Sequence, residues 1–412
     1  MLIAAGLKRI AEPSPPVCRG FVKSVFGKDG MTSVRFAMVG GGGGAFIGPI
    51  HRMAAALSGN CELVAGAFSR DAHNSQATGV QLGLDPHRCH AGWETLLSDE
   101  AARPEGQRAQ FVAIVAPNAV HAPAAIAAME AGFDVLLEKP LADGLSAARA
   151  IAQAAQRTGR LVGVTHPYIA YPMALQARAM VAKGELGAVR RVAVSYIQGW
   201  LGASEDEGGK QAAWRLDPAQ AGPAGAFGDI GSHAFNLVET LTGETIVRLS
   251  ADLRATLEGR RLDDDGAALF ALSGGGKGTL IASQVCAGEA NGLSIAIWGE
   301  KASLHWAQQE PNALRLLSRG KPEQVWRAGS DQAWLEEAVR TGCRTPGGHP
   351  EGFIEAFANI YRDFSDTVAG RTVAMPAFAP IEAGLRCMAF VDAAIASSSA
   401  DGRWHWVAVH NG

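Results

Sequence analysis

The sequence lacks a strong excess of either charge: 37 lysines and arginines stand against 40 aspartates and glutamates, for a formal net charge of -3. Proteins that bind nucleic acid usually carry a basic surface, so nucleic acid is not an expected partner. The chain also lacks an apolar run of the roughly 20 residues that a membrane-spanning helix requires. No membrane association is therefore expected.

Paired cysteines are missing as well. The six cysteines are scattered along the 412 residues, and none forms a CxxC pair. This spacing argues against a disulfide framework and against a zinc site, so no metal is expected. It is typical of a protein in a reducing compartment, and we expect a cytoplasmic location.

The first thirty residues differ from the rest. They are mildly basic, are interrupted by Pro13, Pro15 and Pro16, and lack the long apolar segment and small-residue cleavage site of a secretory signal. We expect residues 1–30 to be a poorly ordered N-terminal extension upstream of a start at Met31. The alternative is an arm that packs against a partner subunit.

A different pattern begins at Val34. The apolar run 34–40 is typical of a strand buried on both faces of a parallel sheet. Five glycines follow, then apolar residues at helical spacing over 47–57, then a second buried-strand run from residue 61. This order predicts a dinucleotide-binding turn, because glycines let the backbone approach a pyrophosphate at a helix N-terminus. A flexible glycine loop is the alternative.

The glycine spacing departs from the usual GxGxxG. Counted from Gly40 and Gly42, the glycine that packs against the helix is Gly48, which makes the loop about three residues longer than usual. Phe46 and Ile47 then lie near its tip. We take Gly40, Gly42, Phe46 and Ile47 as candidates for cofactor binding.

The end of the second strand bears on the choice of cofactor. NAD-binding proteins usually have an acid there, whereas this chain has Ser69 and Arg70. An arginine can pair with a 2′-phosphate, so the sequence favours NADP slightly over NAD. In the alternative, Arg70 is solvated and Asp71, the next residue, contacts the ribose.

Strands and helices continue to alternate up to about residue 165, which predicts an α/β, doubly wound parallel sheet of the Rossmann type. After the strand near residues 111–116, a turn and the start of a helix supply Pro117, Asn118 and His121 as further cofactor-binding candidates.

Two motifs carry a family resemblance. Glu138-Lys139-Pro140 follows a buried strand, and further along Asp229 and His233 form a D-x-x-x-H pattern. Together with the glycine turn, these motifs make the chain from about residue 34 to 396 resemble the Gfo/Idh/MocA oxidoreductases, which include glucose-fructose oxidoreductase and inositol dehydrogenase.

The resemblance implies roles for these residues. Lys139, Asp229 and His233 would line the site where the nicotinamide meets the substrate, with Glu138 and Lys139 also among the cofactor contacts. The Lys139-Pro140 bond is similar to one that is often cis in the family. Asn236 stands where the family frequently has an acid, which bears on the fine substrate contacts and not on the class.

The helical pattern after Ile230 agrees with a site. Asp229, His233, Asn236 and Thr240 would form one polar stripe opposite an apolar one, as on a helix that lines a pocket. A solvated helix face is the alternative.

The second half reads mainly as strands that alternate apolar and polar residues, typical of antiparallel strands with one covered face. The segment GGGKG within it is expected to be a hairpin turn and not a phosphate loop. We therefore expect a dinucleotide-binding domain at 31–158 and, at 159–412, an α+β domain for substrate binding and oligomerisation, with a large open, mainly antiparallel sheet. The family's sheet usually buries one face against a second subunit, which implies a homodimer or homotetramer.

Four residues are candidates for substrate binding. His166 and Tyr168 follow the last strand of the nucleotide domain, where such sheets bind ligands; Trp214 lies in a long polar loop, and Asn236 on the motif helix. For the aromatic residues, packing is the alternative.

The expected activity is hydride transfer between NAD or NADP and a secondary alcohol or ketone of a sugar, inositol or related polyol. His233 suits the base, with Lys139 as the second candidate; Lys139 suits stabilisation of the oxygen; and Asp229 could orient the imidazole or hold a substrate hydroxyl. An NAD-dependent glycosidase that works by transient oxidation remains an alternative. A non-catalytic nucleotide sensor is another, disfavoured because the lysine and the histidine are both present.

Overall fold

The computed structural model describes residues 33–203 and 217–409. The expectations for residues 1–30 and for Trp214 concern positions outside these ranges.

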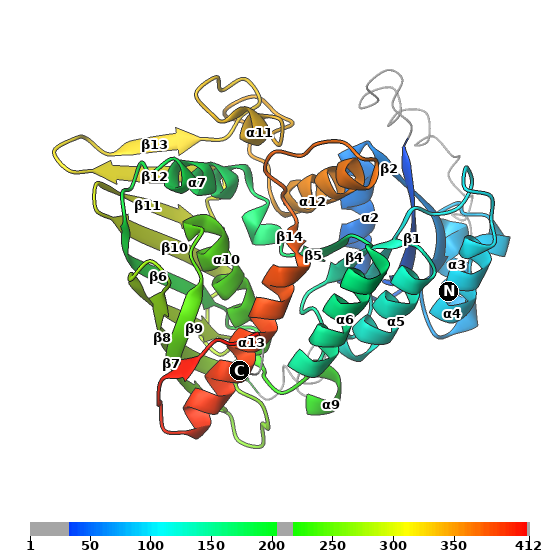
Figure 1. Cartoon of the computed structure of the whole chain (residues 1–412), viewed down its shortest axis with the longest axis horizontal. Helices are drawn as coiled ribbons and strands as arrows, with labels where there is room; N and C mark the ends of the chain where they lie inside the picture. The colour runs from blue at the N-terminus through cyan, green and yellow to red at the C-terminus, as the bar shows by residue number, and fades with distance from the viewer. Residues whose placement is uncertain (1–32, 204–216, 410–412) are drawn as a thin grey trace, which may run out of the picture.

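The first sheet consists mainly of parallel strands that follow one another in the sequence (Figure 1). Its order is β14-β5-β4-β3-β1-β2, and only β14 runs antiparallel to its neighbour. The strands are β1 (Val34–Gly40), β2 (Cys61–Ala67), β3 (Phe111–Val115), β4 (Asp134–Glu138), β5 (Val162–Thr165) and β14 (Ala379–Pro380). The strand order reverses between β1 and β3, and such a switch point is where doubly wound sheets bind their ligands.

Helices cover both faces of this sheet. They are α2 (Ile47–Ser58), α3 (Ala72–Gln81), α4 (Trp93–Ala101), α5 (Asn118–Glu130), α6 (Leu145–Thr158) and α12 (Phe353–Val368). The helices α5 and α6 pack against each other, as do α2 and α12, although α2 and α12 are far apart in sequence (Figure 1). Aromatic rings join α12 to the strands, because Tyr361 lies 5.6 Å from Phe36 and 6.5 Å from Phe111 between ring centroids.

The second sheet has nine strands in the order β13-β12-β11-β10-β6-β9-β8-β7-β15. They are β6 (Val189–Ile197), β7 (Ile246–Arg254), β8 (Asp265–Leu272), β9 (Lys277–Ser283), β10 (Gly292–Gly299), β11 (Ala302–Ala307), β12 (Ala313–Ser318), β13 (Gln324–Arg327) and β15 (His405–Trp406). Neighbouring strands are antiparallel except β6 and β9. The GGGKG segment joins β8 to β9 as a hairpin, as its sequence predicted.

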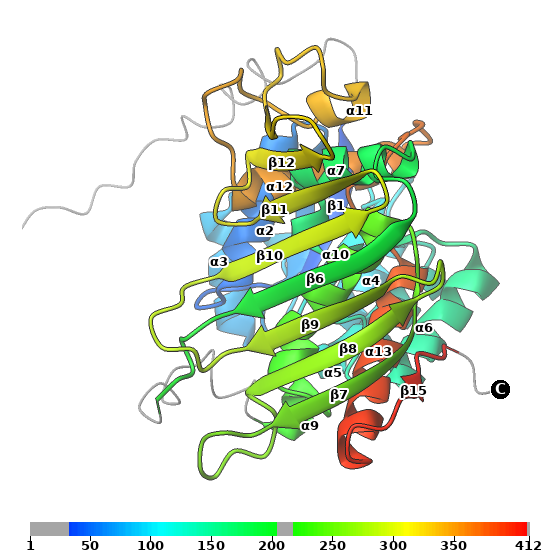
Figure 2. The same ribbon diagram turned by 90° about the vertical axis from the view of Figure 1, so that its left-hand side faces the viewer.

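Helices pack against one face of the second sheet, and Figure 2 shows the other face open toward the viewer. The covering helices are α7 (Pro172–Ala182), α10 (Ser232–Thr242) and α13 (Ile381–Ser399). The alternation along β8 and β9 matches this arrangement: Phe270 and Leu280 are buried, whereas Leu269 is 52% exposed and Ile281 is 43% exposed. Short helices η1 (Pro86–Arg88), η2 (Pro167–Ile169), η4 (Phe227–Gly231), α9 (Pro218–Ala221) and α11 (Glu337–Arg340) complete the described chain.

The expected fold class, a Rossmann sheet followed by an α+β domain with a large open sheet, is confirmed. The first sheet also contains β5 and β14, which lie in the range 159–412, because β5 continues the parallel ladder of β4. The helix expected from Ile230 begins with the π-helical turn η4, and α10 follows it directly. None of the helices in the described ranges is both long and apolar enough to cross a membrane.

Candidate active site

The glycine turn lies at the junction of β1 and β3. Gly40 has a φ of +83°, and a Cβ on it would lie 2.2 Å from the carbonyl oxygen of Val115, so this position requires glycine. A Cβ on Gly48 would lie 2.4 Å from Gly41 Cα, which confirms Gly48 as the glycine that packs the helix onto the turn. The turn is therefore a cradle of bare backbone at the start of α2, and it fits the pyrophosphate of a dinucleotide.

Side chains from α2 and α3 hold the turn in shape. The Gly43 amide donates to Asn74 Oδ1 (3.0 Å) and to Thr78 Oγ1 (3.1 Å), and Arg52 Nη1 donates to the Gly41 carbonyl (2.6 Å). Asn74 and Thr78 were not predicted, because nothing in the sequence indicates that α3 reaches the turn.

The tip of the turn matches its expected position. Phe46 is the residue before α2 and is 62% exposed, and Ile47 is the first residue of the helix. Gly42 is buried, and a Cβ there would lie 2.7 Å from the Phe68 carbonyl oxygen. The amides at the start of α2 thus follow the glycine run after only Ala45 and Phe46.

At the end of β2, Asp71 is the N-cap of α3: its Oδ1 accepts from the His73 amide (2.8 Å) and the Asn74 amide (3.1 Å). The Ser69 hydroxyl oxygen accepts from the Asp71 amide (3.1 Å), and Arg70 is exposed. The Asp71 carboxylate is thus held by its own helix, while Arg70 faces solvent at this edge.

The candidates after β3 occupy different environments. Pro117 is exposed, whereas Asn118 is buried and its Nδ2 donates to the Ala221 carbonyl (3.0 Å). His121 is fully buried, with Nδ1 2.8 Å from the Pro140 carbonyl oxygen and Nε2 2.9 Å from that of Ala116. Burial lowers the pKa of His121. Both of its ring nitrogens are engaged by backbone, so His121 ties the end of β3 to the Lys139-Pro140 turn.

The two motifs meet at Lys139. The Lys139-Pro140 bond is cis, as the resemblance implied. Lys139 Nζ donates to Asp229 Oδ1 and to the Asp229 carbonyl, both at 2.8 Å, and the two side chains are only 15% and 16% exposed. Asp229 Oδ2 accepts from Gln284 Nε2 at 3.0 Å. Residues from the first sheet, η4 and the end of β9 thus form one partly buried, charged centre.

The Glu138 carboxylate holds the backbone of Lys139 in place. Its Oε2 accepts from the Lys139 amide (3.0 Å), and its Oε1 faces His51 Nε2 (3.0 Å) and Thr165 Oγ1 (2.5 Å). Burial alone would raise the pKa of Glu138, but the hydrogen bonds and charges around it, with His51 foremost, hold that pKa below its usual value. His51 Nδ1 lies 2.9 Å from the Tyr361 hydroxyl.

His51 was not predicted, although α2 carries a signal for it. It lies three residues after Gly48 and three before Ala54, on the buried stripe of the helix. A histidine on such a stripe requires buried polar partners, and here they are Glu138 and Tyr361.

His233 stands beside this centre on α10 and is 6% exposed. Its Nδ1 lies 3.3 Å from Nδ1 of His166, and its ring is edge-on to Tyr168 with 4.9 Å between centroids. Within the described ranges, Nε2 of His233 has no hydrogen-bond partner. Burial, then the nearby Lys139 charge, lowers the pKa of His233 well below its usual value, so the ring is neutral.

His166, expected to bind substrate, is 1% exposed and engaged at both ring nitrogens. Nδ1 faces His233, and Nε2 lies 3.8 Å from the thiol sulfur of Cys387. Burial and the Lys139 charge lower the pKa of His166 to about 3. The structure therefore places His166 against the buried side of His233, where its hydrogen bonds are made to the protein.

A network of uncharged polar groups extends from Asp229 across neighbouring strand ends of the second sheet. Gln284 donates to Gln198 Oε1 (3.3 Å), and Gln198 donates to Asn291 Oδ1 (2.7 Å). Tyr196 also donates to Asn291 (2.7 Å), and its hydroxyl is hydrogen-bonded to that of Tyr168. These groups lie close together because the C-terminal ends of β6 and β9 lie beside the N-terminal end of β10.

Asn236, one turn after His233, is 2% exposed. Its Oδ1 is buried and has no hydrogen-bond partner in the part of the chain that the structure describes. A buried amide oxygen without a partner is unusual in folded proteins.

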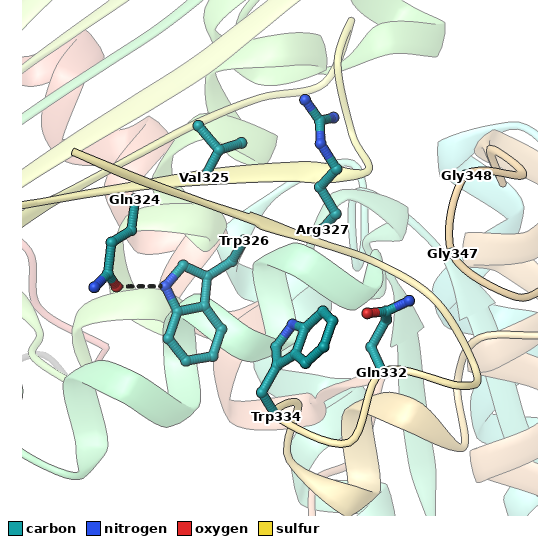
Figure 3. A pocket seen from close by; sticks show the side chains of 8 residues that line it. All are labelled: Gln324, Val325, Trp326, Arg327, Gln332, Trp334, Gly347 and Gly348. Carbon is teal, nitrogen blue, oxygen red and sulfur yellow. Dashed lines mark hydrogen bonds between the residues drawn. The ribbon is translucent and has the colours of Figure 1, made fainter. Parts of the chain in front are cut away.

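Two hollows lie away from this centre. One of about 480 Å³ lies beside β13, where Trp326, Trp334 and Gln332 line it and Trp326 Nε1 donates to Gln324 Oε1 at 3.2 Å (Figure 3). Another of about 450 Å³ lies on the open face of the second sheet over β6, β9, β10 and β11. Neither is lined by Lys139, Asp229 or His233. Among described residues, no group of three or more histidine, cysteine or acidic side chains is placed to hold a metal ion.

Comparison with known proteins shows which proteins the chain resembles. The sequence is 32% identical over 383 residues to an uncharacterised oxidoreductase of Bacillus subtilis, YfiI, covering 90% of this chain and 96% of that protein. Among solved structures, an inositol dehydrogenase homolog from Azotobacter vinelandii complexed with NAD+ has a TM-score of 0.84 at 36% identity, covering 91% of this chain and 97% of that one. Levoglucosan dehydrogenase of Pseudarthrobacter phenanthrenivorans is 25% identical over 91% of this chain and 98% of that protein.

Two family models match consecutive parts of the chain. Residues 34–166 match the oxidoreductase family with an NAD-binding Rossmann fold, and residues 174–305 match the GFO/IDH/MocA C-terminal domain. The chain therefore belongs to the Gfo/Idh/MocA family of NAD-binding oxidoreductases.

Proposed function

We propose that this protein oxidises or reduces a sugar, inositol or related polyol at a secondary alcohol or ketone, with NAD or NADP as the hydride carrier. The observation that supports this most is the meeting of Lys139, Asp229 and His233 in one partly buried centre. A solved relative from Azotobacter vinelandii, 35% identical, is an inositol dehydrogenase homolog complexed with NADH and myo-inositol, which supports the substrate class.

In this proposal the dinucleotide is held at the turn from Gly40 to Ile47, and the exposed Arg70 pairs with the 2′-phosphate if NADP is used. When bound, the nicotinamide supplies the chemistry of hydride acceptance or donation. His121 and Glu138 act as positioning residues, since both bind the backbone around Lys139.

For oxidation, His233 takes the hydroxyl proton at Nε2. A general base must be unprotonated and within reach of its proton, and the neutral ring, whose Nε2 has no hydrogen-bond partner among the described residues, meets the first requirement. The Lys139 ammonium stabilises the developing negative charge on the oxygen, and it acts strongly because it is largely shielded from water. Asp229 binds Lys139 and Gln284, so its role is to orient the lysine.

Hydroxyl groups of a polyol need several donors and acceptors, and the network along the second sheet offers them. Gln198, Gln284 and Asn291 present amides next to Asp229, and Tyr168 presents its ring to His233. We propose that these groups and Asn236, whose amide oxygen has no partner in the described part of the chain, determine which polyol is accepted.

We also propose that the open face of the second sheet is covered in a homodimer or homotetramer. Leu269 and Ile281 are exposed on this face, and the hollow beside Ile281 is lined by small residues together with polar ones such as Glu310 and Arg315, a mixture that a second subunit could cover. A reducing, cytoplasmic setting is supported by the free thiols of the five described cysteines.

The test is a panel of sugars, polyols and their keto forms assayed by nicotinamide absorbance with NAD and NADP, for wild type, Lys139→Ala and His233→Ala. Each substitution should lower kcat by about 10²–10⁴-fold on the best substrate. Both variants should still bind the nucleotide, since the glycine turn is intact. Lys183→Ala, at an exposed lysine paired with Glu336, is the matched control and should keep wild-type turnover.

Near-native turnover in His233→Ala would show that the base lies elsewhere, with Lys139 as the next candidate. Cleavage of a glycoside without net change in nicotinamide absorbance would favour the glycosidase alternative. No turnover of any polyol with either nucleotide would overturn the proposed function.

A further inference from the structure

Four buried groups form a line that begins at Nδ1 of His233 and continues through His166 and Cys387 to the Ser232 carbonyl. His233 Nδ1 faces Nδ1 of His166 at 3.3 Å, and His166 Nε2 faces the Cys387 sulfur at 3.8 Å. The same sulfur lies 3.7 Å from the Ser232 carbonyl oxygen and donates to it. Both histidines and the cysteine are at most 6% exposed. The line joins α10, the end of β5 and α13.

Proton counting along this line allows one arrangement that satisfies every contact. A carbonyl oxygen only accepts, so the single thiol proton of Cys387 is directed to Ser232. The sulfur is then an acceptor, and His166 must donate to it from Nε2. A neutral imidazole carries one N–H, so Nδ1 of His166 is an acceptor and His233 must donate from Nδ1. The neutral His233 ring therefore has its lone pair on Nε2.

We propose that Cys387 and His166 are positioning residues that fix His233 in the tautomer with an unprotonated Nε2, the form that can act as a base. The proposal rests on the proposed function, and it assigns His166 a role other than substrate contact. In the opposite arrangement the Cys387 thiol would donate to Nε2 of His166, and His166 would donate from Nδ1 to His233. The single proton of the neutral His233 ring would then be on Nε2, which could not accept another.

The arrangement also balances in the oxidation step. The substrate O–H bond breaks and its proton forms a bond to His233 Nε2. The C–H hydrogen leaves with its two bonding electrons as hydride to the oxidised nicotinamide of the proposed function, and the carbon–oxygen double bond forms from the electrons of the broken O–H bond. His233 is then an imidazolium whose Nδ1 proton still bonds to His166, so no second group has to move.

Burial, and then the charges around the line, set the protonation of its members. Lys139 lowers the pKa of both rings, whereas Glu138 raises that of His166 and Asp229 raises that of His233; Glu239, Arg386 and Lys139 act on the thiol. Burial and Lys139 lower the pKa of each histidine, so both rings are neutral. Burial raises the pKa of the Cys387 thiol, so it keeps the proton that it gives to Ser232.

A direct test reads the tautomers without any turnover. Protein labelled with 15N at its 11 histidines is studied by long-range proton–nitrogen NMR at neutral pH, with His233→Gln and His166→Phe used for assignment. The expected wild-type spectrum has the proton of His233 on Nδ1 and that of His166 on Nε2. A spectrum with the His233 proton on Nε2 would overturn the proposal.

Variants at Cys387 extend the test to turnover. Cys387→Ala removes the acceptor of His166 and should lower kcat roughly 10-fold or more, while His166→Phe should lower it by about 10²–10⁴-fold, the range for a lost acid–base function. KM and the NADH dissociation constant should change little. Cys387→Ser, which can donate to Ser232 and accept from His166, should restore the NMR pattern and most of kcat.

Cys343→Ala is the matched control, because Cys343 is also a buried thiol that donates to a helix carbonyl, that of Val339 at 3.7 Å. It should leave both the NMR pattern and kcat unchanged. If Cys387→Ala had the wild-type NMR spectrum and the wild-type kcat, the proposed positioning role of Cys387 would be refuted, even if His166→Phe does not fold. If wild type shows the expected tautomers but turns over no polyol, the proposed function fails and the tautomer assignment stands.

Discussion

Replacing Gly48 by alanine isolates the packing of α2 onto the glycine turn. A Cβ at this position would lie 2.3 Å from the Gly41 carbonyl oxygen and 2.4 Å from its Cα, whereas an ordinary contact begins near 3.4 Å. Because the obstacle is backbone, the start of α2 and the turn must separate by about 1 Å. Overpacking of this kind costs about 1–3 kcal/mol of the free energy of unfolding, or roughly 1–4 °C in melting temperature for a chain of this size.

The same separation moves the turn and the helix amides apart, and both are needed to hold a pyrophosphate. A misplacement of this size should weaken NADH binding by about 10-fold or more. The assay is isothermal titration with NADH and NADPH, with thermal unfolding of the free protein measured in parallel. Turnover at saturating nucleotide then shows how much of the loss is binding.

Gly43→Ala is the control in the same turn. Its Cβ would lie 3.0 Å from Asn74 Oδ1, the end of a side chain that can move, and Gly43 does not have a positive φ. Gly43→Ala should therefore weaken NADH binding much less than Gly48→Ala does, since a small shift of the Asn74 side chain that bonds to the Gly43 amide relieves the contact. Wild-type affinity and melting temperature in Gly48→Ala would refute the reasoning, since the backbone contact would then carry no energy.

Three other outcomes are expected. Arg70→Ala should weaken NADPH binding by about 1.5–3 kcal/mol and leave NADH binding unchanged. Both affinities are measured by titration, with Arg157→Ala, at another exposed arginine, as the control. Equal losses for the two nucleotides would show that Arg70 does not contact the 2′-phosphate. Light scattering should give a dimer or tetramer that Ile281→Glu, on the open sheet face, converts to smaller species; a wild-type monomer near 42.9 kDa at micromolar concentration would contradict this. Because the pKa of His166 falls from its ordinary 6.5 to about 3 on folding, its contribution to stability is complete above pH 6.5 and is lost as pH falls toward 3, by up to about 1.4 kcal/mol per pH unit. Urea unfolding at pH 7, 6 and 5 should therefore show a smaller pH dependence for His166→Phe than for wild type, and parallel curves would count against the depressed pKa.

The parts of the site that are local in sequence could be predicted. The glycine turn follows from a strand, a run of glycines and a helix within thirty residues, and only glycine fits at Gly40 and Gly48. The catalytic candidates Lys139, Asp229 and His233 came from a resemblance, since no local pattern states that a strand end and a distant helix meet.

Contacts that depend on strand pairing could not be predicted. Gln198, Gln284 and Asn291 meet because β6 pairs in parallel with β9 and antiparallel with β10, and neither the pairing nor the register is written in the strands themselves. Cys387 reaches His166 because α13 packs against β5, the strand that His166 follows, as well as against α10.

The pattern of α10 was predicted only in part. Asp229 lies on the π-helical turn before the helix, and residues 232–238 are all buried. The polar residues His233 and Asn236 are thus enclosed by protein on a helix that was expected to have one polar stripe. Packing of α10 against the second sheet and against α7 and α13 accounts for this, because it covers the helix on several sides.

The return of α12 and β14 to the first sheet affects how the protein is made on the ribosome. Tyr361 supplies the hydroxyl that bonds to His51, and Asn60 Nδ2 donates to the Arg362 carbonyl, so the nucleotide-binding half depends on residues near the end of the chain. A nascent chain that has emerged only as far as residue 166 holds five strands of that sheet but neither β14 nor the helix that covers α2. The first domain to be translated is therefore completed only after β6–β13 of the second sheet have been synthesised, and the apolar surface beneath α12 stays uncovered until α12 itself has emerged.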